Sequence, residues 1–148
     1  PWDPDRSEDV RETAIAAFRD HWGSFPHTTE TWAAATTGAT TRPDLHRVAV
    51  AGDGTVVGYL LVRAYPQDWE LKGVRDAWVS SIGTLRSWRG RGVASALLVA
   101  AMRAMRDEGF SHASLGVDTE NPTGAPSLYA GHGFTHERTM SAWHLPLT

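Results

Sequence analysis

The segment SWRGRGVASALL, residues 87–98, constrains the fold more than any other part of this chain. Arg89 and Arg91 alternate with Gly90 and Gly92, and a run of small residues and leucines follows at once. Glycine lowers helix stability and neighbouring arginines repel each other, so the cluster is unfavourable unless an anion binds there. The segment therefore predicts a strand–loop–helix unit whose loop holds an anion.

The residues on either side predict how the anion is bound. A strand is expected to end near Leu85 and a helix to begin near Gly92. The first amides of a helix have no intrahelical acceptor, and the helix dipole adds positive charge there. The two glycines let an anion approach these amides closely. A surface turn without a ligand is the alternative that this segment alone leaves open. The helix is expected to reach about Arg106 and to pack through Ala94, Leu97, Leu98, Ala101 and Met105.

Two known phosphate-binding motifs do not match this segment. A Walker A loop ends in Gly-Lys-Ser or Gly-Lys-Thr, and neither tripeptide follows here. The dinucleotide fingerprint needs a third glycine where this chain has Ser95, and an acidic residue about 20 residues further on. Asp118 and Glu120 come somewhat late for that role, and no βαβ unit is repeated. A nucleoside-triphosphatase and a dinucleotide-binding protein are therefore both disfavoured.

Periodicity and turn residues predict the other elements. Ser7 or Asp9 is expected to cap the first helix. The expected elements are helices at 7–21 and 28–37, a hairpin at 47–65 that turns at Asp53-Gly54, strands at 74–85 and 112–119, a helix at 123–132 and a closing hairpin at 134–147. This order is typical of a mixed α/β fold, and 148 residues fit a single domain, residues 1–148.

Composition narrows the function classes. A net charge of -3 argues against a general nucleic-acid binder, which more often carries a positive excess. The apolar runs are far shorter than the ~18 residues of a membrane span. The chain opens without a basic-then-apolar leader, so a cytoplasmic protein is expected. The absence of cysteine excludes thiolate catalysis, disulfides and cysteine-based metal sites.

Three linked pieces of sequence carry a resemblance to a known family. They are IGTL at 82–85, the pattern Arg-x-x-Gly-x-Ala at Arg89, Gly92 and Ala94, and NPTGAPSLYAGHGF at 121–134. Together they resemble the GNAT superfamily of acyl-CoA-dependent N-acyltransferases, from about residue 47 to the end. The N-terminal AFRDHWGSFPHTTETWA is similar to actinobacterial mycothiol synthase-like domains. Some of these relatives carry two such domains, so the chain is expected to be either one whole protein or the C-terminal half of a tandem one.

The resemblance implies a fold and a coenzyme site. The fold is a mixed, mostly antiparallel central sheet flanked by helices, with a splayed strand pair where CoA binds. The strand before the loop would pair with the pantetheine arm, and the loop amides would hold the pyrophosphate. Asn121 would contact the arm, or would only be a turn residue before Pro122. The implied CoA-binding residues are Ile82, Gly83, Thr84, Arg89, Gly90, Arg91, Gly92, Val93, Ala94, Ser95 and Asn121.

The resemblance also implies catalytic roles. Tyr129 matches the tyrosine that protonates the departing CoA thiolate, which suits pKa values of ~10 for a phenol and ~8.5 for a thiol. The alternative to a catalytic role for Tyr129 is a structural one, as a buried aromatic residue of the helix. Where mycothiol synthase-like domains place a glutamate base this chain has Trp78. Asp76, two residues earlier on the same strand face, is the candidate base, and its alternatives are a plain surface charge or a reaction that relies on solvent. A main-chain amide near Thr84 or Leu85 would polarise the thioester oxygen.

These residues predict an N-acetyltransferase with acetyl-CoA as co-substrate and without a metal. The amine would attack the thioester directly in a ternary complex. The acceptor is a small-molecule or peptide amine that the sequence does not identify, and no nucleic acid or membrane partner is expected. A homodimer is compatible with the superfamily. The alternative function is a non-catalytic acyl-CoA-binding domain, which the missing glutamate favours and Tyr129 opposes.

Overall fold

The computed structural model describes residues 1–19, 26–116, 125–141, 143 and 145–147. Two compact units, Pro1–Gly116 and Val117–Thr148, divide the chain, and each is described by itself. Within the described ranges, none of the helices has the length and hydropathy that crossing a bilayer requires.

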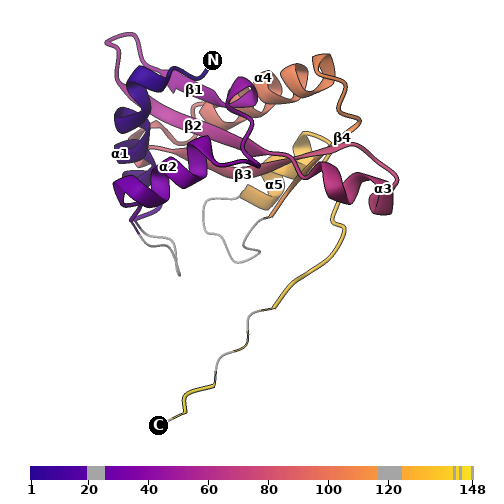
Figure 1. The fold of residues 1–148 in the computed structure, drawn as a ribbon. Coiled ribbons are helices and arrows are strands. Elements are labelled where there is room, and N and C mark those ends of the chain that lie inside the picture. The colour runs from indigo at the N-terminus through magenta and orange to yellow at the C-terminus, as the bar shows by residue number, and fades with distance from the viewer. Residues whose placement is uncertain (20–25, 117–124, 142, 144, 148) are drawn as a thin grey trace. The chain divides into compact units, whose positions relative to one another are not determined.

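A four-stranded sheet organises the first unit (Figure 1). The strands are β1 (Arg47–Val50), β2 (Val56–Arg63), β3 (Asp76–Thr84) and β4 (His112–Leu115), and they lie in the order β1-β2-β3-β4. β1–β2 and β2–β3 are antiparallel, whereas β3–β4 is parallel. This mixed sheet confirms the predicted fold class, and the hairpin turns at Gly54 with φ of 89°, as Asp53-Gly54 predicted.

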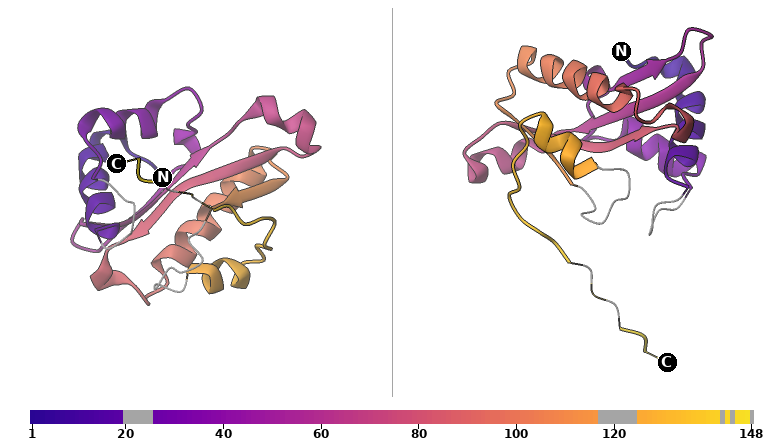
Figure 2. Two further views of the ribbon diagram at one scale, coloured as in Figure 1. Left: turned by 90° about the horizontal axis from the view of Figure 1, so that it is seen from below. Right: turned by 180° about the vertical axis from the view of Figure 1, so that it is seen from behind.

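Helices cover both faces of this sheet (Figures 1 and 2). α1 (Ser7–Ala17) and α2 (Thr29–Thr37) lie on one face, which we call the α1 face. α4 (Val93–Asp107) lies on the other, the α4 face. The buried residues of α4 include Leu97, Leu98, Ala101 and Met105, which follow the predicted helical stripe.

Two glycines let these helices approach the sheet. A Cβ added to Gly58 would lie 2.8 Å from a methyl of Val93, so this glycine is needed for α4 to pack on β2. A Cβ added to Gly83 would lie 2.8 Å from the ring of Tyr59 and 3.0 Å from that of Phe18. Gly58 therefore points to the α4 face and Gly83 to the α1 face. The site residue Gly83 has a packing role of its own.

β3 contains a bulge that changes its register with β2. Leu61 pairs with Ser81 but Val62 pairs with Val79, so Ser80 is an extra residue on β3. A bulge of this kind bends the strand and increases its twist. The bend falls where β3 stops pairing with β4, at Val79.

The remaining elements are short. They are 3₁₀ turns at Pro4–Arg6, Pro43–Leu45, Pro66–Asp68 and Arg86–Trp88, helix α3 (Trp69–Lys72) between β2 and β3, and helix α5 (Ala125–Gly131) in the second unit.

Two expectations about the ends of elements are wrong. The first helix is preceded by a 3₁₀ turn that Asp3 caps, and its own N-cap, Arg6, makes no side-chain capping bond, so neither Ser7 nor Asp9 is the cap. The closing hairpin is absent from the described residues between 134 and 147, which form no strand. A strand needs a partner for its backbone groups, and local sequence alone does not supply one.

Candidate active site

The loop after β3 exposes its backbone, as the sequence predicted. Gly90 and Gly92 have φ of 75° and 80°, a left-handed conformation that residues with a Cβ avoid. A Cβ added to either glycine would have no atom within 4 Å. The loop therefore has open space where the two side chains are missing, and both glycines are exposed.

The first turn of α4 adds further amide donors. Gly92 is the N-cap and has no side chain to cap the helix, and the first turn contains no acidic residue. The amide of Ala96 is bonded to the Gly92 carbonyl at 3.0 Å, so the amides of Val93 and Ala94 precede the intrahelical ladder. A helix start without an acidic cap attracts an anion.

The two arginines of the loop have different partners. The Arg91 guanidinium stacks over the ring of Trp88, 4.8 Å from its centroid, and forms no ion pair within the described part of the chain. Arg89 donates to the main-chain carbonyls of Ala17, at 2.8 Å, and Thr84, at 3.3 Å. Arg89 thus joins the end of β3 to the end of α1, and Arg91 is the arginine whose charge is available to a ligand.

β3 has an unpaired edge beside this loop. It pairs with β4 only from Asp76 to Val79, and in the described residues the edge from Ser80 to Thr84 has no partner strand. The amide of Leu85 donates to the Val57 carbonyl at 2.9 Å, so it points to β2 and cannot polarise a thioester. Because amides alternate along a strand, those of Thr84 and Ile82 point to the open edge.

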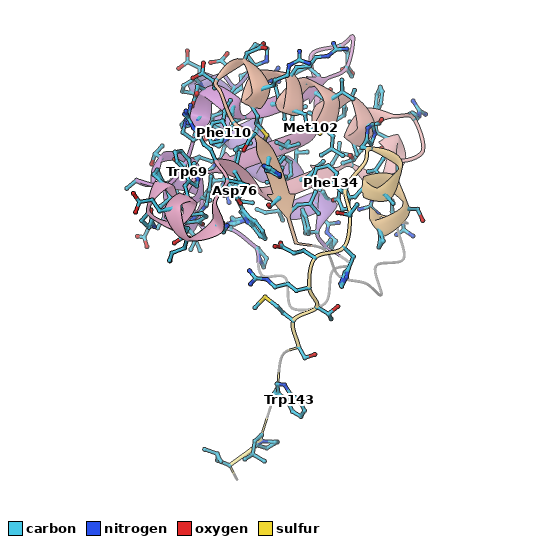
Figure 3. All side chains as sticks on the ribbon, turned by 90° about the vertical axis from the view of Figure 1, so that its right-hand side faces the viewer. Trp69, Asp76, Met102, Phe110, Phe134 and Trp143 are labelled. Atoms are coloured by element: carbon cyan, nitrogen blue, oxygen red, sulfur yellow. The ribbon has the colours of Figure 1, made fainter. Side chains whose placement is uncertain are left out.

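Asp76 lies at the other end of β3, in a network of side chains. The residue is buried, with a side-chain exposure of 8%. Its Oδ2 accepts from Lys72 Nζ at 3.0 Å and from Ser114 Oγ at 3.2 Å. Trp69 and Phe110 lie near it in Figure 3, and the Trp69 indole donates to the Asp76 carbonyl at 3.1 Å. Within the described residues Oδ1 accepts no hydrogen bond, so it is the oxygen open to a further partner.

The partners of Asp76 were missed in the sequence. Lys72 precedes Asp76 by four residues, and within one helix this spacing would have predicted an ion pair. Here α3 ends at Lys72 and β3 begins at Asp76, so no single helix contains both residues. Ser114 comes from β4 and is far away in sequence. Only the parallel pairing of β3 with β4 brings Ser114 to Asp76.

Tyr129 belongs to the second unit. It lies in α5 and packs edge-on against Phe134, with ring centroids 6.1 Å apart. Burial raises the pKa of the Tyr129 phenol above its usual value. A raised pKa keeps the hydroxyl protonated, as a proton donor must be. Asn121, together with Asp118 and Glu120, lies outside the described residues.

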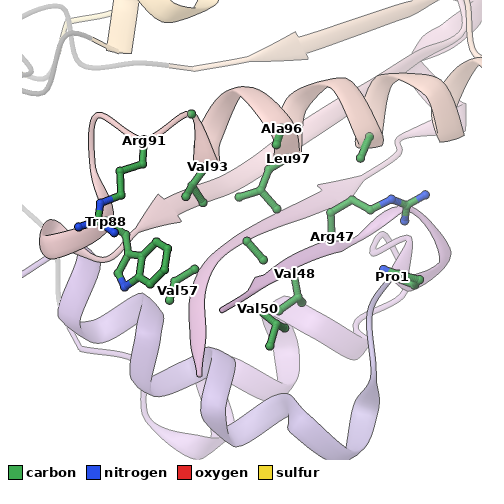
Figure 4. Close-up of a pocket in the computed structure, with 13 residues that line it drawn as sticks. Pro1, Arg47, Val48, Val50, Val57, Trp88, Arg91, Val93, Ala96 and Leu97 are labelled. Atoms are coloured by element: carbon green, nitrogen blue, oxygen red, sulfur yellow. The ribbon is translucent and has the colours of Figure 1, made fainter. Parts of the chain in front are cut away.

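A cavity of about 440 Å³ lies between β1 and α4 (Figure 4). Its walls are mostly apolar, with Arg91 and Trp88 at one end and Arg47 towards the other. In the sheet β2 lies between β1 and β3, so the β1 wall of this cavity and the open edge of β3 are on opposite sides of β2. In the described residues no group of three or more histidine, aspartate or glutamate side chains is arranged to hold a metal ion.

The sequence profile of the Acetyltransferase (GNAT) family matches residues 7–134. Comparison with curated proteins finds no significant match.

Solved structures share the fold at low sequence identity. AAC(6')-Iy, in complex with the bisubstrate analog CoA-S-monomethyl-acetylneamine, is 19% identical, with a TM-score of 0.69 over 97% of this chain and 93% of that one. The ribosomal-protein-alanine N-acetyltransferase from Brucella melitensis is 15% identical, with a TM-score of 0.73 over 95% and 93%. A transcriptional regulator from Bacillus halodurans is 18% identical, with a TM-score of 0.73 over 97% and 96%. At these identities the likeness concerns the fold alone.

Proposed function

The chain belongs to the GNAT family of acetyltransferases, and from this premise we propose that it transfers the acetyl group of acetyl-CoA to an amine. One observation carries the proposal. The unpaired edge of β3, from Ser80 to Thr84, leads through the 3₁₀ turn Arg86–Trp88 into a loop whose glycines, Gly90 and Gly92, are exposed. An extended arm with a diphosphate at one end is complementary to that arrangement, because strand edges bind extended chains and helix starts bind phosphates.

The dimensions of this surface suit the coenzyme. The pantetheine arm has about as many chain bonds as five residues of extended peptide, so it spans about 17 Å. Main-chain groups of Ile82 and Thr84 would bond the arm, as a neighbouring strand would. With the diphosphate at the start of α4, the thioester would lie near Ser80, where the bulge interrupts β3.

The reaction we propose needs no acyl-enzyme, in keeping with a chain that has no cysteine. The amine nitrogen attacks the thioester carbonyl, a C–N bond forms, and the C–S bond breaks. The thiolate takes the proton of the Tyr129 hydroxyl. The proton lost by the amine passes to Oδ1 of Asp76 through a chain of water molecules, because Asp76 is about 13 Å along β3 from Ser80. Both roles are part of the proposal, and the Tyr129 role rests on the family resemblance.

A second function is favoured by the Asp76 network. Oδ2 of Asp76 is already occupied by Lys72 and Ser114, and Trp78 stands where the resemblance places a glutamate. The alternative is therefore a domain that binds acyl-CoA without transferring the acyl group. We also propose that the acceptor resembles that of mycothiol synthase-like domains. This proposal rests only on the similarity of the N-terminal segment.

Turnover and CoA binding distinguish the two functions. Because the protein has no thiol, a thiol-reactive dye reports only the CoA released from acetyl-CoA, so a broad amine panel can be assayed directly. Replacing Tyr129 with phenylalanine is expected to lower kcat by about 100-fold and to leave CoA affinity unchanged, because only the proton is removed. If the native protein binds CoA but no amine on the panel releases the thiol, the binding function is the correct one.

A further inference from the structure

The α1 face of the sheet carries an arginine beside the place where the thioester would lie. Arg63, at the end of β2, pairs directly with Trp78 of β3. Paired residues of antiparallel strands point to the same face, with Cβ atoms about 5 Å apart. Tyr59 and Leu61 of β2 pack in the core under α1, so alternation along β2 places Arg63 on the α1 face as well.

Arg63 has no anionic partner in the part of the chain that the structure describes. Its side chain is half-buried and takes part in no ion pair and no side-chain hydrogen bond there. Thr41, which bridges to Arg63 on the other side of β2, carries no charge. Nearby His46 is neutral at physiological pH, because burial lowers its pKa to about 4. A half-buried guanidinium without a carboxylate is set to bind one from a ligand.

The only carboxylate described along this face of β3 does not balance that charge. Asp76 is two residues from Trp78 and points to the same face, but Lys72 neutralises it at 3.0 Å. Arg89, at the Thr84 end, adds a second positive charge. Along these strands Arg63 and Arg89 are thus not balanced by Asp76, which disfavours a polycationic acceptor and favours one with an anionic group.

We propose that Arg63 binds an anionic group of the acceptor, so that the acceptor is an amine that also carries a carboxylate or a phosphate. The inference rests on the proposed function. The half-buried ring of Trp78, which lies 3.6 Å from where a Cβ on Gly116 would be, offers an apolar surface beside Arg63 for the body of such a molecule.

The first test is calorimetric binding to protein saturated with desulfo-CoA, which cannot react. L-Phenylalanine is compared with L-phenylalaninamide, which keeps the amine and the ring but has no carboxylate. Phosphoethanolamine and ethanolamine form the pair that distinguishes phosphate from carboxylate. At least one anionic member is expected to bind about 10-fold or more tightly than its neutral partner, the effect of one charge-assisted hydrogen-bonded pair.

Variants assign the preference to one arginine. Replacing Arg63 with methionine is expected to abolish the preference for the anionic probe. Arg63→Lys is expected to retain part of this preference, because lysine keeps the charge but not the planar guanidinium. Arg47→Met is the matched control, since Arg47 lies by the β1–α4 cavity, and it is expected to keep the full preference. Unchanged desulfo-CoA affinity shows that each variant is folded; if Arg63→Met fails this check, Arg63→Lys carries the comparison.

The inference and the proposed function fail in different ways. Equal binding of both members of each pair, no binding of any probe, or a preference that survives loss of Arg63 would overturn the inference. CoA release decides the proposed function separately. A preference for the anionic member without any CoA release would leave Arg63 as an anion site on a binding domain.

Discussion

The two ends of β3 offer polar groups of different kinds. At the Thr84 end the groups are main-chain amides, including those of the exposed glycines Gly90 and Gly92. At the Asp76 end they are side chains, which are already bonded to one another. Amides and arginines keep their state over the physiological pH range, whereas side-chain networks depend on ionisation. Anion binding at one end should therefore respond to charge, and stability near the other end should respond to pH.

The largest expected effect is acid destabilisation through His46. Its Nδ1 accepts from the amide of Val62, which pairs with Val79 in the paired half of β3. Burial lowers its pKa from 6.5 to about 4, so the unfolded chain binds a proton between these values and the folded chain does not. Neutral His46 therefore contributes about 3 kcal/mol to the free energy of unfolding. This contribution is complete above pH 6.5 and is lost as the pH falls to about 4.

Urea unfolding at a series of pH values from 7.5 to 4.5 measures this loss. The His46→Gln variant keeps an acceptor for the amide and cannot titrate, so its stability should change much less over the same range. A native protein whose stability is flat down to pH 4.5 would contradict the assignment.

The next effect concerns CoA binding at the Thr84 end. Replacing Arg91 with glutamate reverses a charge beside the exposed amides and should raise the Kd for CoA about 100-fold at low salt. The same reversal at Arg106, exposed in the last turn of α4, is the control that changes net charge equally. Calorimetry at low salt and at 0.5 M salt checks the cause, because screening should shrink the Arg91 effect. Equal affinities for the two variants would place the diphosphate elsewhere.

The smallest effect is expected at the Asp76 end. Asp76→Asn removes the ion pair with Lys72, whose side chain is 42% exposed, so the loss of stability should be only about 1 kcal/mol. CoA affinity should not change, since Asp76 is about 26 Å along the strand from Thr84. Measuring kcat in the same variant tests the base: a fall of 100-fold or more identifies Asp76, and an unchanged kcat leaves solvent as the base. Weaker CoA binding would contradict the separation of the two ends.

Much of the fold was predictable because the signals are local. The period of Leu97, Leu98, Ala101 and Met105 predicted α4 and its buried stripe, and Asp53-Gly54 predicted the hairpin turn. The closing hairpin at 134–147 was predicted and is absent from the described residues, because strand propensity without a partner does not specify a strand. Arg89 shows the same limit within the site: the sequence grouped it with Arg91, but only the folded chain brings the Ala17 carbonyl to its guanidinium.

The sequence by itself determined the loop at the start of α4, since two glycines free the backbone amides whatever surrounds them. Tertiary structure alone decided the rest of the candidate site. The pairing of β3 with β4 stops at Val79 and opens the edge, and the register of β2 with β3 sets Arg63 beside Trp78. The conformational freedom of glycine depends on its residue type, so the sequence predicts it. An open strand edge or an unpaired charge depends on which distant residues lie nearby, and this is decided only when the chain folds.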